Sequence, residues 1–487
     1  MEDNPSPSCS HAGDAKIALG DRSTQALQLL GKTMHSEDSV YEVAIIGGGI
    51  SGTALLYCLS NYTNVSRIAL IEKKQDIALV NSYKTSNSQT LHFGDVETNY
   101  NLEKAKKVKK AASLVKNYIL RNDPQQKTYS KYNKMVLAIG KEQTEELRER
   151  YKEFKTLFPE LKLIEREEIE LFEPNVVKNR ALDEEINALF TEEGYAIDFQ
   201  NLARSFLHKS INNSNKLIDL MTETKVKRLK KEGGLYHIQT DRGVILSKVV
   251  AFAAGAYSLL FAKSLGYGMD YALLSVAGNF YLAPGVLNGK VYTVQLKKIP
   301  FAAIHGDSEV HDQSQTRFGP TAKVTPLLEQ HNYATLVDYF RTAGLSLNAF
   351  ISFFNILSDK DIFKYIVRNF IYDVPLIGKR LFLKEVRKIV PSIKSSEIQL
   401  AKGYGGIRPQ IVNLKTKRLE LGEAKIIGED ILFNITPSPG ASTCLQNAED
   451  DTEKLVSFLG QEHTFDKDRF LADLGDDLAL AQREYGA

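Results

Sequence analysis

Tryptophan is absent from this chain of 487 residues, and cysteine occurs only three times, as Cys9, Cys58 and Cys444. So few cysteines exclude a disulfide scaffold and a zinc site made of cysteine thiolates. No stretch reaches about 18 consecutive apolar residues, so the sequence predicts no transmembrane helix. The formal net charge is only +2, which gives no support to a dedicated nucleic-acid binder. We therefore expect neither a nucleic-acid partner nor a metal site.

The length and the aromatic residues that are present suffice for a large folded core. The chain is long enough for two or three units of roughly 150 residues, and it contains 22 tyrosines and 23 phenylalanines. Residues 1–40 lack sustained periodicity, and we predict a mostly disordered extension there. Its acidic residues are atypical of a mitochondrial presequence, but a targeting role stays open.

A glycine-rich turn follows the first clearly apolar run. Gly47, Gly49 and Gly52 form the pattern G-x-G-x-x-G between a predicted strand at residues 43–46 and a helical pattern at residues 54–59. In a dinucleotide-binding unit, the first glycine permits a tight turn and the second lets the backbone approach a pyrophosphate. The third lets the helix pack close to the strand, and the helix N-terminus offers N–H groups to the phosphates.

An acidic residue completes this unit. A second apolar run at residues 68–71 ends in Glu72, which lies 20 residues after Gly52. A carboxylate at this place accepts hydrogen bonds from ribose hydroxyls and disfavours a 2′-phosphate. The unit predicts dinucleotide binding, but it does not distinguish NAD from FAD.

Three further segments carry a resemblance to a known family. They are residues 87–100 (NSQTLHFGDVETNY), residues 249–258 (VVAFAAGAYS), and the pair 405–410 (GGIRPQ) with 436–442 (TPSPGAS). In this order they resemble the FAD-dependent oxidoreductases related to D-amino-acid oxidase, and most of all the shorter form of malate:quinone oxidoreductase. The resemblance covers about residues 41–460.

The resemblance implies an α/β fold with a discontinuous, Rossmann-type FAD-binding domain and a substrate domain of mixed β-sheet and helices. We expect the FAD-binding domain at residues 41–120, 186–268 and 401–460, the substrate domain at 121–185 and 269–400, and a tail at 461–487. Hydrophobic patterns predict helices at 102–119, 143–171 and much of 325–400, and strands at 244–254 and 431–434.

The resemblance also implies which residues hold FAD. Gly47, Gly49 and Gly52 match the pyrophosphate loop and Glu72 the ribose acid; Asn87, Ser88, Gln89 and Thr90 match a segment near the pyrophosphate and the flavin ring; Val226 matches the strand at the adenine; Ala254 and Gly255 match the turn beneath the cofactor; Gly440, Ala441 and Ser442 match a late loop at the polar edge of the flavin. N–H donors at that edge stabilise the negative charge of reduced flavin.

The substrate that the resemblance implies is (S)-malate, which is oxidised to oxaloacetate while a membrane quinone takes the electrons. Arg408 matches a carboxylate clamp, for which a guanidinium is suited by its two parallel N–H groups. His305 and His92 match family histidines, and either could take the hydroxyl proton. We favour His305 for substrate contact, with Asp307 orienting it, and place His92 beside the flavin. For Arg317, structural support is as reasonable as a site role.

Three other functions stay open. An L-2-hydroxyglutarate dehydrogenase would differ by one methylene in its substrate, which is worth only about 1–3 kcal/mol in a pocket. A flavin amine or amino-acid oxidase would need no quinone. A non-catalytic dinucleotide-binding protein would not need Arg408, His305 and the late loop together.

A membrane quinone requires a protein without a spanning helix to lie on the membrane surface. Residues 360–391 combine eight Lys and Arg residues and three acids with interleaved large apolar residues, which suits an anionic membrane. An ordinary helical layer with a solvated basic face is an equally good interpretation, and the lysine-rich residues 104–110 are a lesser candidate. We expect peripheral association, with the mitochondrial inner membrane in a eukaryote or the cytoplasmic face of the inner membrane in a bacterium.

Overall fold

The computed structural model describes residues 40–475, apart from 213–214, 296–303, 344–350, 352–357, 359, 373, 375–376, 421–423 and 437–438. The predicted extension at residues 1–40, except Val40, lies outside the described residues, as does the end of the predicted tail from residue 476. Within the described ranges, no helix is both long enough and apolar enough to cross a membrane.

The first sheet is built from the apolar runs at the start of the chain. Its main path is β19-β20-β9-β1-β2-β6, and the β7–β8 hairpin joins it at β9. β1 lies between β9 and β2 and pairs with both in parallel. The eight strands are β1 (Val40–Ile46), β2 (Arg67–Ile71), β6 (Leu217–Met221), β7 (Val226–Glu232), β8 (Leu235–Thr240), β9 (Val244–Phe252), β19 (Ala424–Gly428) and β20 (Ile431–Ile435).

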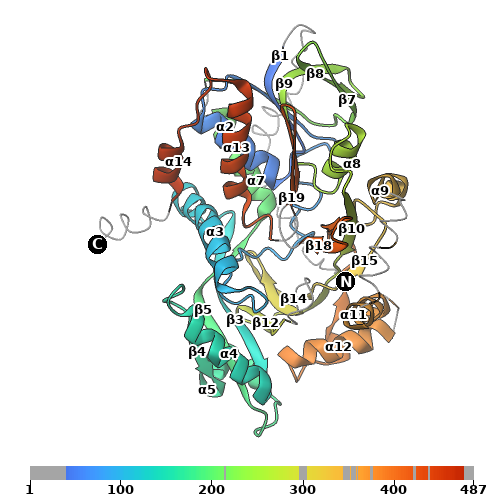
Figure 1. Cartoon of the computed structure of the whole chain (residues 1–487). Helices are drawn as coiled ribbons and strands as arrows, with labels where there is room; N and C mark the ends of the chain where they lie inside the picture. The colour runs from blue at the N-terminus through green and yellow to red at the C-terminus, as the bar shows by residue number, and fades with distance from the viewer. Residues whose placement is uncertain are drawn as a thin grey trace, which may run out of the picture.

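Helices cover both faces of this sheet, which lies in the upper half of Figure 1. Val43 and Ile45 of β1 belong to the core shared with α2, α7 and α13, whereas Ala44 and Ile46 belong to the core shared with α8. A strand that is buried on both faces has to be apolar throughout, which explains the continuous run in the sequence. The predicted Rossmann-type arrangement is confirmed.

A second, mixed sheet of eight strands occupies the lower half of Figure 1, in the order β16-β11-β14-β13-β12-β3-β5-β4. Its strands are β3 (Tyr129–Ile139), β4 (Lys162–Glu165), β5 (Ile186–Ile197), β11 (Tyr281–Pro284), β12 (Lys290–Thr293), β13 (His305–Glu309), β14 (Asp312–Gly319) and β16 (Gln399–Leu400). A four-stranded sheet in the order β15-β10-β17-β18 contains β10 (Tyr271–Ala277), β15 (Lys323–Val324), β17 (Ile407–Asn413) and β18 (Arg418–Glu420).

The helices agree with most of the predicted ones. They are α2 (Ile50–Tyr62), α3 (Leu102–Asn122), α4 (Lys141–Phe154), α5 (Arg166–Phe172), α6 (Pro174–Val177), α7 (Phe199–Asn212), α8 (Tyr257–Ser264), α9 (Leu336–Ala343), α11 (Lys360–Tyr372), α12 (Ile377–Ile389), α13 (Cys444–Leu459) and α14 (Lys467–Leu474), with short 3-10 turns at Tyr333–Thr335 and Ser395–Glu397. The helix at 102–119 and the helical content of 325–400 are confirmed.

Two predictions about the middle of the chain need correction. The helix predicted over residues 143–171 is interrupted, because α4 ends at Phe154 and β4 follows before α5. Pro159 disfavours helix at the residue before it, and Ile164 is buried as β4 pairs with β5, so sheet pairing overrides helical propensity. Sheet membership also differs from the predicted boundaries: β5 belongs to the second sheet rather than the first, and β17 pairs with β10.

Candidate active site

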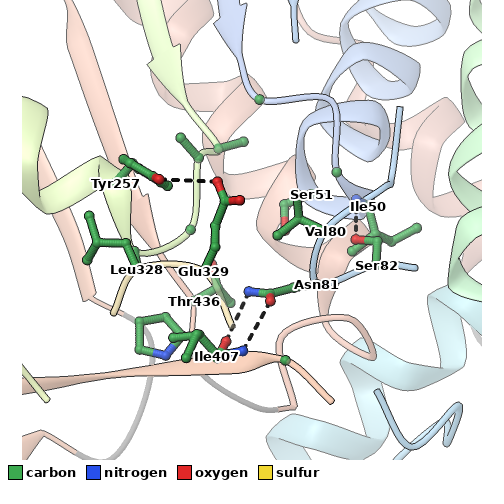
Figure 2. Close-up of a pocket in the computed structure, with 18 of the residues that line it drawn as sticks. Ile50, Ser51, Val80, Asn81, Ser82, Tyr257, Leu328, Glu329, Ile407 and Thr436 are labelled. Carbon is green, nitrogen blue, oxygen red and sulfur yellow. Dashed lines mark hydrogen bonds between the residues drawn. The ribbon is translucent and has the colours of Figure 1, made fainter. Parts of the chain in front are cut away.

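A cavity of about 650 Å³ opens where β1, β2 and β9 reach their carboxyl ends. Ligands of open α/β sheets bind at this edge, and the volume is typical of a cofactor site. The wall is formed by residues from segments that are far apart in the sequence: 46–51, 71–73, 78–82, 86–88 with 90 and 92, 224–227, 253–264, 328–329 with 338 and 341, 406–409, 434 with 436, and 439–442. Several of these side chains are shown in Figure 2.

The glycine turn lies at the sheet side of this cavity. Gly47 has φ +111°, a conformation that side chains rarely adopt, and a Cβ at Gly52 would lie 1.9 Å from the carbonyl oxygen of Gly47. Gly47 and Gly49 line the cavity, whereas Gly52, in the first turn of α2, is buried against the backbone of the glycine turn. Helix α2 begins at Ile50, whose N–H donates to Ser82 Oγ at 3.0 Å, as Figure 2 shows. The first turn of α2 therefore faces the cavity, as the fingerprint predicts.

Glu72 lines the cavity and also ties the two strands together. Its carboxylate accepts the N–H of Gly48 at 2.8 Å and that of Lys74 at 2.9 Å. These bonds hold the carboxylate at the mouth of the glycine turn, in the place that a ribose acid requires. Val226, Ala254 and Gly255 line the same cavity.

The segment that resembles a flavin contact lies along the wall with one exception. Asn87, Ser88 and Thr90 line the cavity, but the side chain of Gln89 points away from it. Gln89 has φ +53°, is 3% exposed, and accepts hydrogen bonds from the N–H of Val310 and from Arg317. Its backbone N–H donates to Asn87 Oδ1 and its carbonyl oxygen accepts the N–H of Ile197, so the backbone groups of Gln89 are bonded within the protein as well.

The late loop meets this segment directly. Gly440, Ala441 and Ser442 line the cavity, and Ser442 Oγ accepts the N–H of His92 at 3.0 Å. It also lies 3.4 Å from the carbonyl oxygen of Thr90. Two segments about 350 residues apart in the sequence are thus joined at one end of the cavity.

Arg408 contributes an uncompensated cation to the same cavity. The start of its strand is held against residues 78–82, because the side-chain amide of Asn81 pairs with both the N–H and the carbonyl of Ile407, as Figure 2 shows. No described residue forms a hydrogen bond or an ion pair with the Arg408 guanidinium, and burial lowers the pKa of this group. A half-buried guanidinium is partly desolvated and has no anionic partner among the described residues, so the site is suited to bind an anion.

The two predicted histidines lie in different places. His92 lines the cavity, and its Nδ1 lies 2.6 Å from Glu97 Oε1. His305 is 1% exposed, is absent from the cavity wall, and lies 3.4 Å from Asp307 Oδ1. The ring of Tyr292 lies against His305, and its hydroxyl bonds to Thr90 of the wall. The structure therefore brings His92 and Arg408 together around one cavity and places His305 behind its wall.

The sequence profile of the malate:quinone oxidoreductase family matches residues 39–456, nearly all of the described chain. The chain belongs to this family. A probable malate:quinone oxidoreductase from Campylobacter jejuni is 40% identical over 445 residues, which are 89% of this chain and 99% of that protein. The mitochondrial L-2-hydroxyglutarate dehydrogenase of Homo sapiens is 26% identical over 458 residues, covering 89% of this chain and 92% of that protein.

The fold agrees with that of solved flavoproteins. A dithionite-reduced L-α-glycerophosphate oxidase from Mycoplasma pneumoniae with FAD bound has a TM-score of 0.60 and 18% identity, covering 88% of this chain and 96% of that one. At this identity the likeness concerns the fold alone. It places the malate:quinone oxidoreductase chain among mixed α/β folds of the kind that the sequence predicts.

The sequence analysis named Asp307 and Arg317 but did not predict that they form a buried charged cluster with Lys290 behind the cavity wall. Asp307 lies 3.2 Å from Lys290 Nζ and 3.0 Å from Arg317 Nη2, and all three side chains have no exposed surface. Arg317 also reaches the carbonyl oxygens of Asn87 and Ser88. The cluster supports the backbone of residues 87–90, so Arg317 contributes to the structure of the cavity wall. The position of Lys290 beside the apolar residues of β12 was the sequence feature that could have indicated this cluster.

A second missed group lines the cavity itself. Glu329 is 6% exposed, pairs with Lys73 and Lys74, and accepts a hydrogen bond from Tyr257 at 3.1 Å, as Figure 2 shows. Burial raises the pKa of this carboxyl, but the charge and hydrogen bond of Lys73 outweigh that effect and lower the pKa to about 2. No sequence motif marks Glu329, because its partners are some 255 residues away.

Proposed function

We propose that this protein oxidises (S)-malate to oxaloacetate with FAD held in the cavity, and that a membrane quinone receives the two electrons. The observation that carries the proposal is the uncompensated Arg408 guanidinium, which faces the same cavity as His92 and the glycine turn. Membership of the malate:quinone oxidoreductase family supports the choice of substrate and acceptor.

The residues of the cavity fit an extended FAD. The first turn of α2 with Gly47 and Gly49 would hold the pyrophosphate, Glu72 the ribose, and Val226 the adenine side. Ser442 and its neighbours would lie at the flavin ring, where N–H donors favour the reduced form. When bound, FAD accepts the hydride that leaves C2 of malate.

The protein's own groups bind the substrate and take its proton. Malate is a dianion, and Arg408 can hold one carboxylate through two parallel hydrogen bonds. As the C2–H bond breaks with its electron pair, the C2 hydroxyl loses its proton and becomes the carbonyl of oxaloacetate. We assign this proton to Nε2 of His92, because His92 lines the cavity with Arg408 whereas His305 lies behind Tyr292. Substrate contact by His305 stays a prediction.

The second candidate is the oxidation of L-2-hydroxyglutarate, which uses the same groups. The human enzyme of that name is 26% identical to this chain, against 40% for the Campylobacter jejuni protein, and this difference favours malate. A flavin amine oxidase has weaker support, because none of these relatives carries that activity in its name.

Anaerobic reduction of the purified flavoprotein tests this assignment. We expect L-malate to bleach the flavin absorbance within seconds and a soluble quinone, but not NAD, to restore it. L-2-hydroxyglutarate should reduce the flavin roughly 10- to 200-fold less efficiently, as one additional methylene implies. Preferential bleaching by L-2-hydroxyglutarate would transfer the assignment to that substrate. A flavin that responds to neither acid would contradict the proposed function.

We also propose that the protein reaches its quinone by lying on the membrane through helices α9 and α11, at the right edge of Figure 1. More than half of the exposed large apolar side chains in the described part of the chain fall between residues 333 and 377, and they include Val337, Phe340, Phe363, Val367 and Phe370. Lysines and arginines accompany them in the sequence, which supports an anionic lipid surface.

The predicted membrane segment at 360–391 needs one correction. Helix α12 packs its apolar face inward, since Phe382, Val386 and Ile389 have no exposed surface and belong to the core of the second sheet. Ile366 is buried as well, and Leu376 lies outside the described residues. The surface that we propose therefore consists of the outer faces of α9 and α11 rather than the whole segment. Association at the inner membrane remains the expected localisation.

Vesicle sedimentation tests this surface. The double variant Phe363→Ser/Phe370→Ser should shift the protein from the pellet to the supernatant with vesicles containing phosphatidylglycerol, at least about tenfold, because two apolar anchors are lost. Reduction of the flavin by malate should not change. A control is Leu171→Ser/Leu182→Ser, which removes two apolar side chains that are even more exposed, in the second-sheet region. Equal sedimentation of all three proteins would exclude this surface.

A further inference from the structure

One ring nitrogen of His92 is committed to a buried carboxylate. Its Nδ1 lies 2.6 Å from Oε1 of Glu97, and the two side chains are 16% and 7% exposed. An ionised carboxylate only accepts hydrogen bonds, so Nδ1 must carry the hydrogen. A neutral ring then has no hydrogen on Nε2, which lies on the far side of the ring and can accept a proton.

Glu97 is ionised in this setting. Burial by itself raises the pKa of the carboxyl, but the hydrogen bond and charge of His92, together with the charge of Lys134, outweigh burial and lower the pKa to about 2. The hydrogen bond from Nδ1 and the charge of Lys134 favour the ionised carboxylate, and we infer that Glu97 accepts this bond with the imidazole neutral as well as charged. The direction of the His92–Glu97 hydrogen bond follows from this.

The hydrogen bonding of the Glu97 side chain is directed to His92. Among the other described residues, only His92 bonds to its carboxylate, and its second oxygen Oε2 is buried without a hydrogen-bond partner. The nearby cation Lys134 lies 2.7 Å from Asp95, and both are almost fully buried. The charges of Lys134 and Arg150 also interact with Glu97, but the hydrogen bond that its carboxylate accepts from another described residue comes from His92.

Both members of the pair are held by their backbones. Arg150 Nη2 donates to the carbonyl oxygen of Glu97 at 2.7 Å, and the hydroxyl oxygen of Thr98 accepts the N–H of Gln295 at 2.8 Å. On the other side, the N–H of His92 donates to Ser442 Oγ. The orientation of the imidazole is thus fixed before a substrate arrives, which is the condition for efficient proton transfer.

We propose that Glu97 is a positioning residue for malate oxidation, which keeps Nδ1 of His92 protonated and leaves Nε2 free to accept the hydroxyl proton. The inference rests on the proposed function, in which His92 is the base. In the reaction the C2–H bond breaks and its electron pair leaves with the hydride to FAD. The O–H bond breaks, its proton binds Nε2, and a C=O bond forms. The resulting imidazolium lies directly against Glu97, which neutralises the new charge.

The variant Glu97→Gln tests this role. The amide can either accept from Nδ1 or donate to it, so the tautomer is no longer enforced. In stopped-flow experiments we expect flavin reduction by malate to slow at least about a hundredfold, while the malate concentration for half-maximal rate changes little, because Arg408 is untouched. Glu97→Asp, which keeps the charge, should recover part of the rate. Glu103→Gln, at an exposed glutamate on α3, is the control and should behave as wild type.

A second readout does not depend on turnover. Proton–nitrogen spectra of the holoenzyme labelled with ¹⁵N-histidine, with the His92 signal identified by its loss in His92→Gln, should report a hydrogen on Nδ1 in wild type and a mixture of tautomers in Glu97→Gln. A hydrogen on Nε2 in wild type, or unchanged reduction in Glu97→Gln, would overturn the positioning role. Failure of wild type to be reduced by malate would instead contradict the proposed function, and the spectra would still decide the tautomer.

Discussion

Replacing Arg408 by methionine is expected to abolish efficient oxidation of malate while the protein keeps its FAD. The guanidinium is the one side chain in the described cavity wall that is cationic, half-buried and without a hydrogen bond or ion pair to a described residue. Loss of a buried, charge-assisted pair with a carboxylate typically costs about 2–5 kcal/mol. The ratio kcat/KM for malate should therefore fall at least about a hundredfold, as measured by anaerobic flavin reduction.

The same substitution should not weaken the fold. Burial disfavours the charged form of Arg408 and lowers its pKa. In the substrate-free protein this cation therefore reduces the free energy of unfolding. Methionine fills similar space without a charge, and we expect the Tm of the substrate-free variant to equal or exceed that of wild type. Arg408→Lys should recover only part of the activity, because it lacks the planar fork. The control Arg418→Met, at an exposed position on β18, should leave both properties unchanged. Full activity in Arg408→Met would exclude the clamp.

Replacing Gly52 by alanine is expected to remove both the cofactor and much of the stability. The new Cβ would lie 1.9 Å from the carbonyl oxygen of Gly47, and this oxygen is part of the backbone and cannot turn aside. Helix α2 would have to move away from β1, which would disrupt a core that is buried on both sides of the contact. We expect a loss of at least about 3 kcal/mol in the free energy of unfolding, measured by chemical denaturation, and purified protein without visible flavin.

Gly49→Ala separates cofactor binding from folding. A Cβ at Gly49 would meet only Ser82 Oγ, at 3.4 Å, which is an ordinary contact. Its methyl group would, however, stand at the cavity wall where the pyrophosphate would lie. We therefore expect Gly49→Ala to lose affinity for FAD, seen as a lower ratio of flavin to protein absorbance, with the apoprotein stability unchanged. Equal stability losses in the two variants would contradict this division of roles.

The local parts of the site could be predicted from the sequence because local backbone geometry depends on neighbouring residues. The glycine spacing, the flanking apolar runs and Glu72 specify one turn between two strands and a helix, and the structure has that turn at the cavity. Arg408, His92 and Ser442 were found through motifs that resemble a family, and all three line the cavity as expected. The chemical roles of these residues remain predictions.

Other properties depend on contacts between distant segments, which no local pattern encodes. Helical periodicity at residues 143–171 could not anticipate that β4 pairs with β5. The sequence favoured His305 over His92 for substrate contact, whereas the packing of Tyr292 places His305 behind the wall and His92 lines the cavity. The apolar face of α11 and that of α12 likewise have similar compositions, but the first is exposed to solvent and the second is buried in the core.

Neighbouring residues specify the dinucleotide turn and the Rossmann-type strands of this chain, and its motifs carry a family resemblance that includes one arginine and two histidines. Which charges find a partner depends on the packing of distant segments. Asp307 forms ion pairs with Lys290 and Arg317. The Arg408 guanidinium remains available to a ligand, and the Glu97 carboxylate accepts the hydrogen bond of His92. The reason is physical: the energy of a buried charge depends on the partners within a few ångströms, and in this fold those partners come from strands and loops up to hundreds of residues apart.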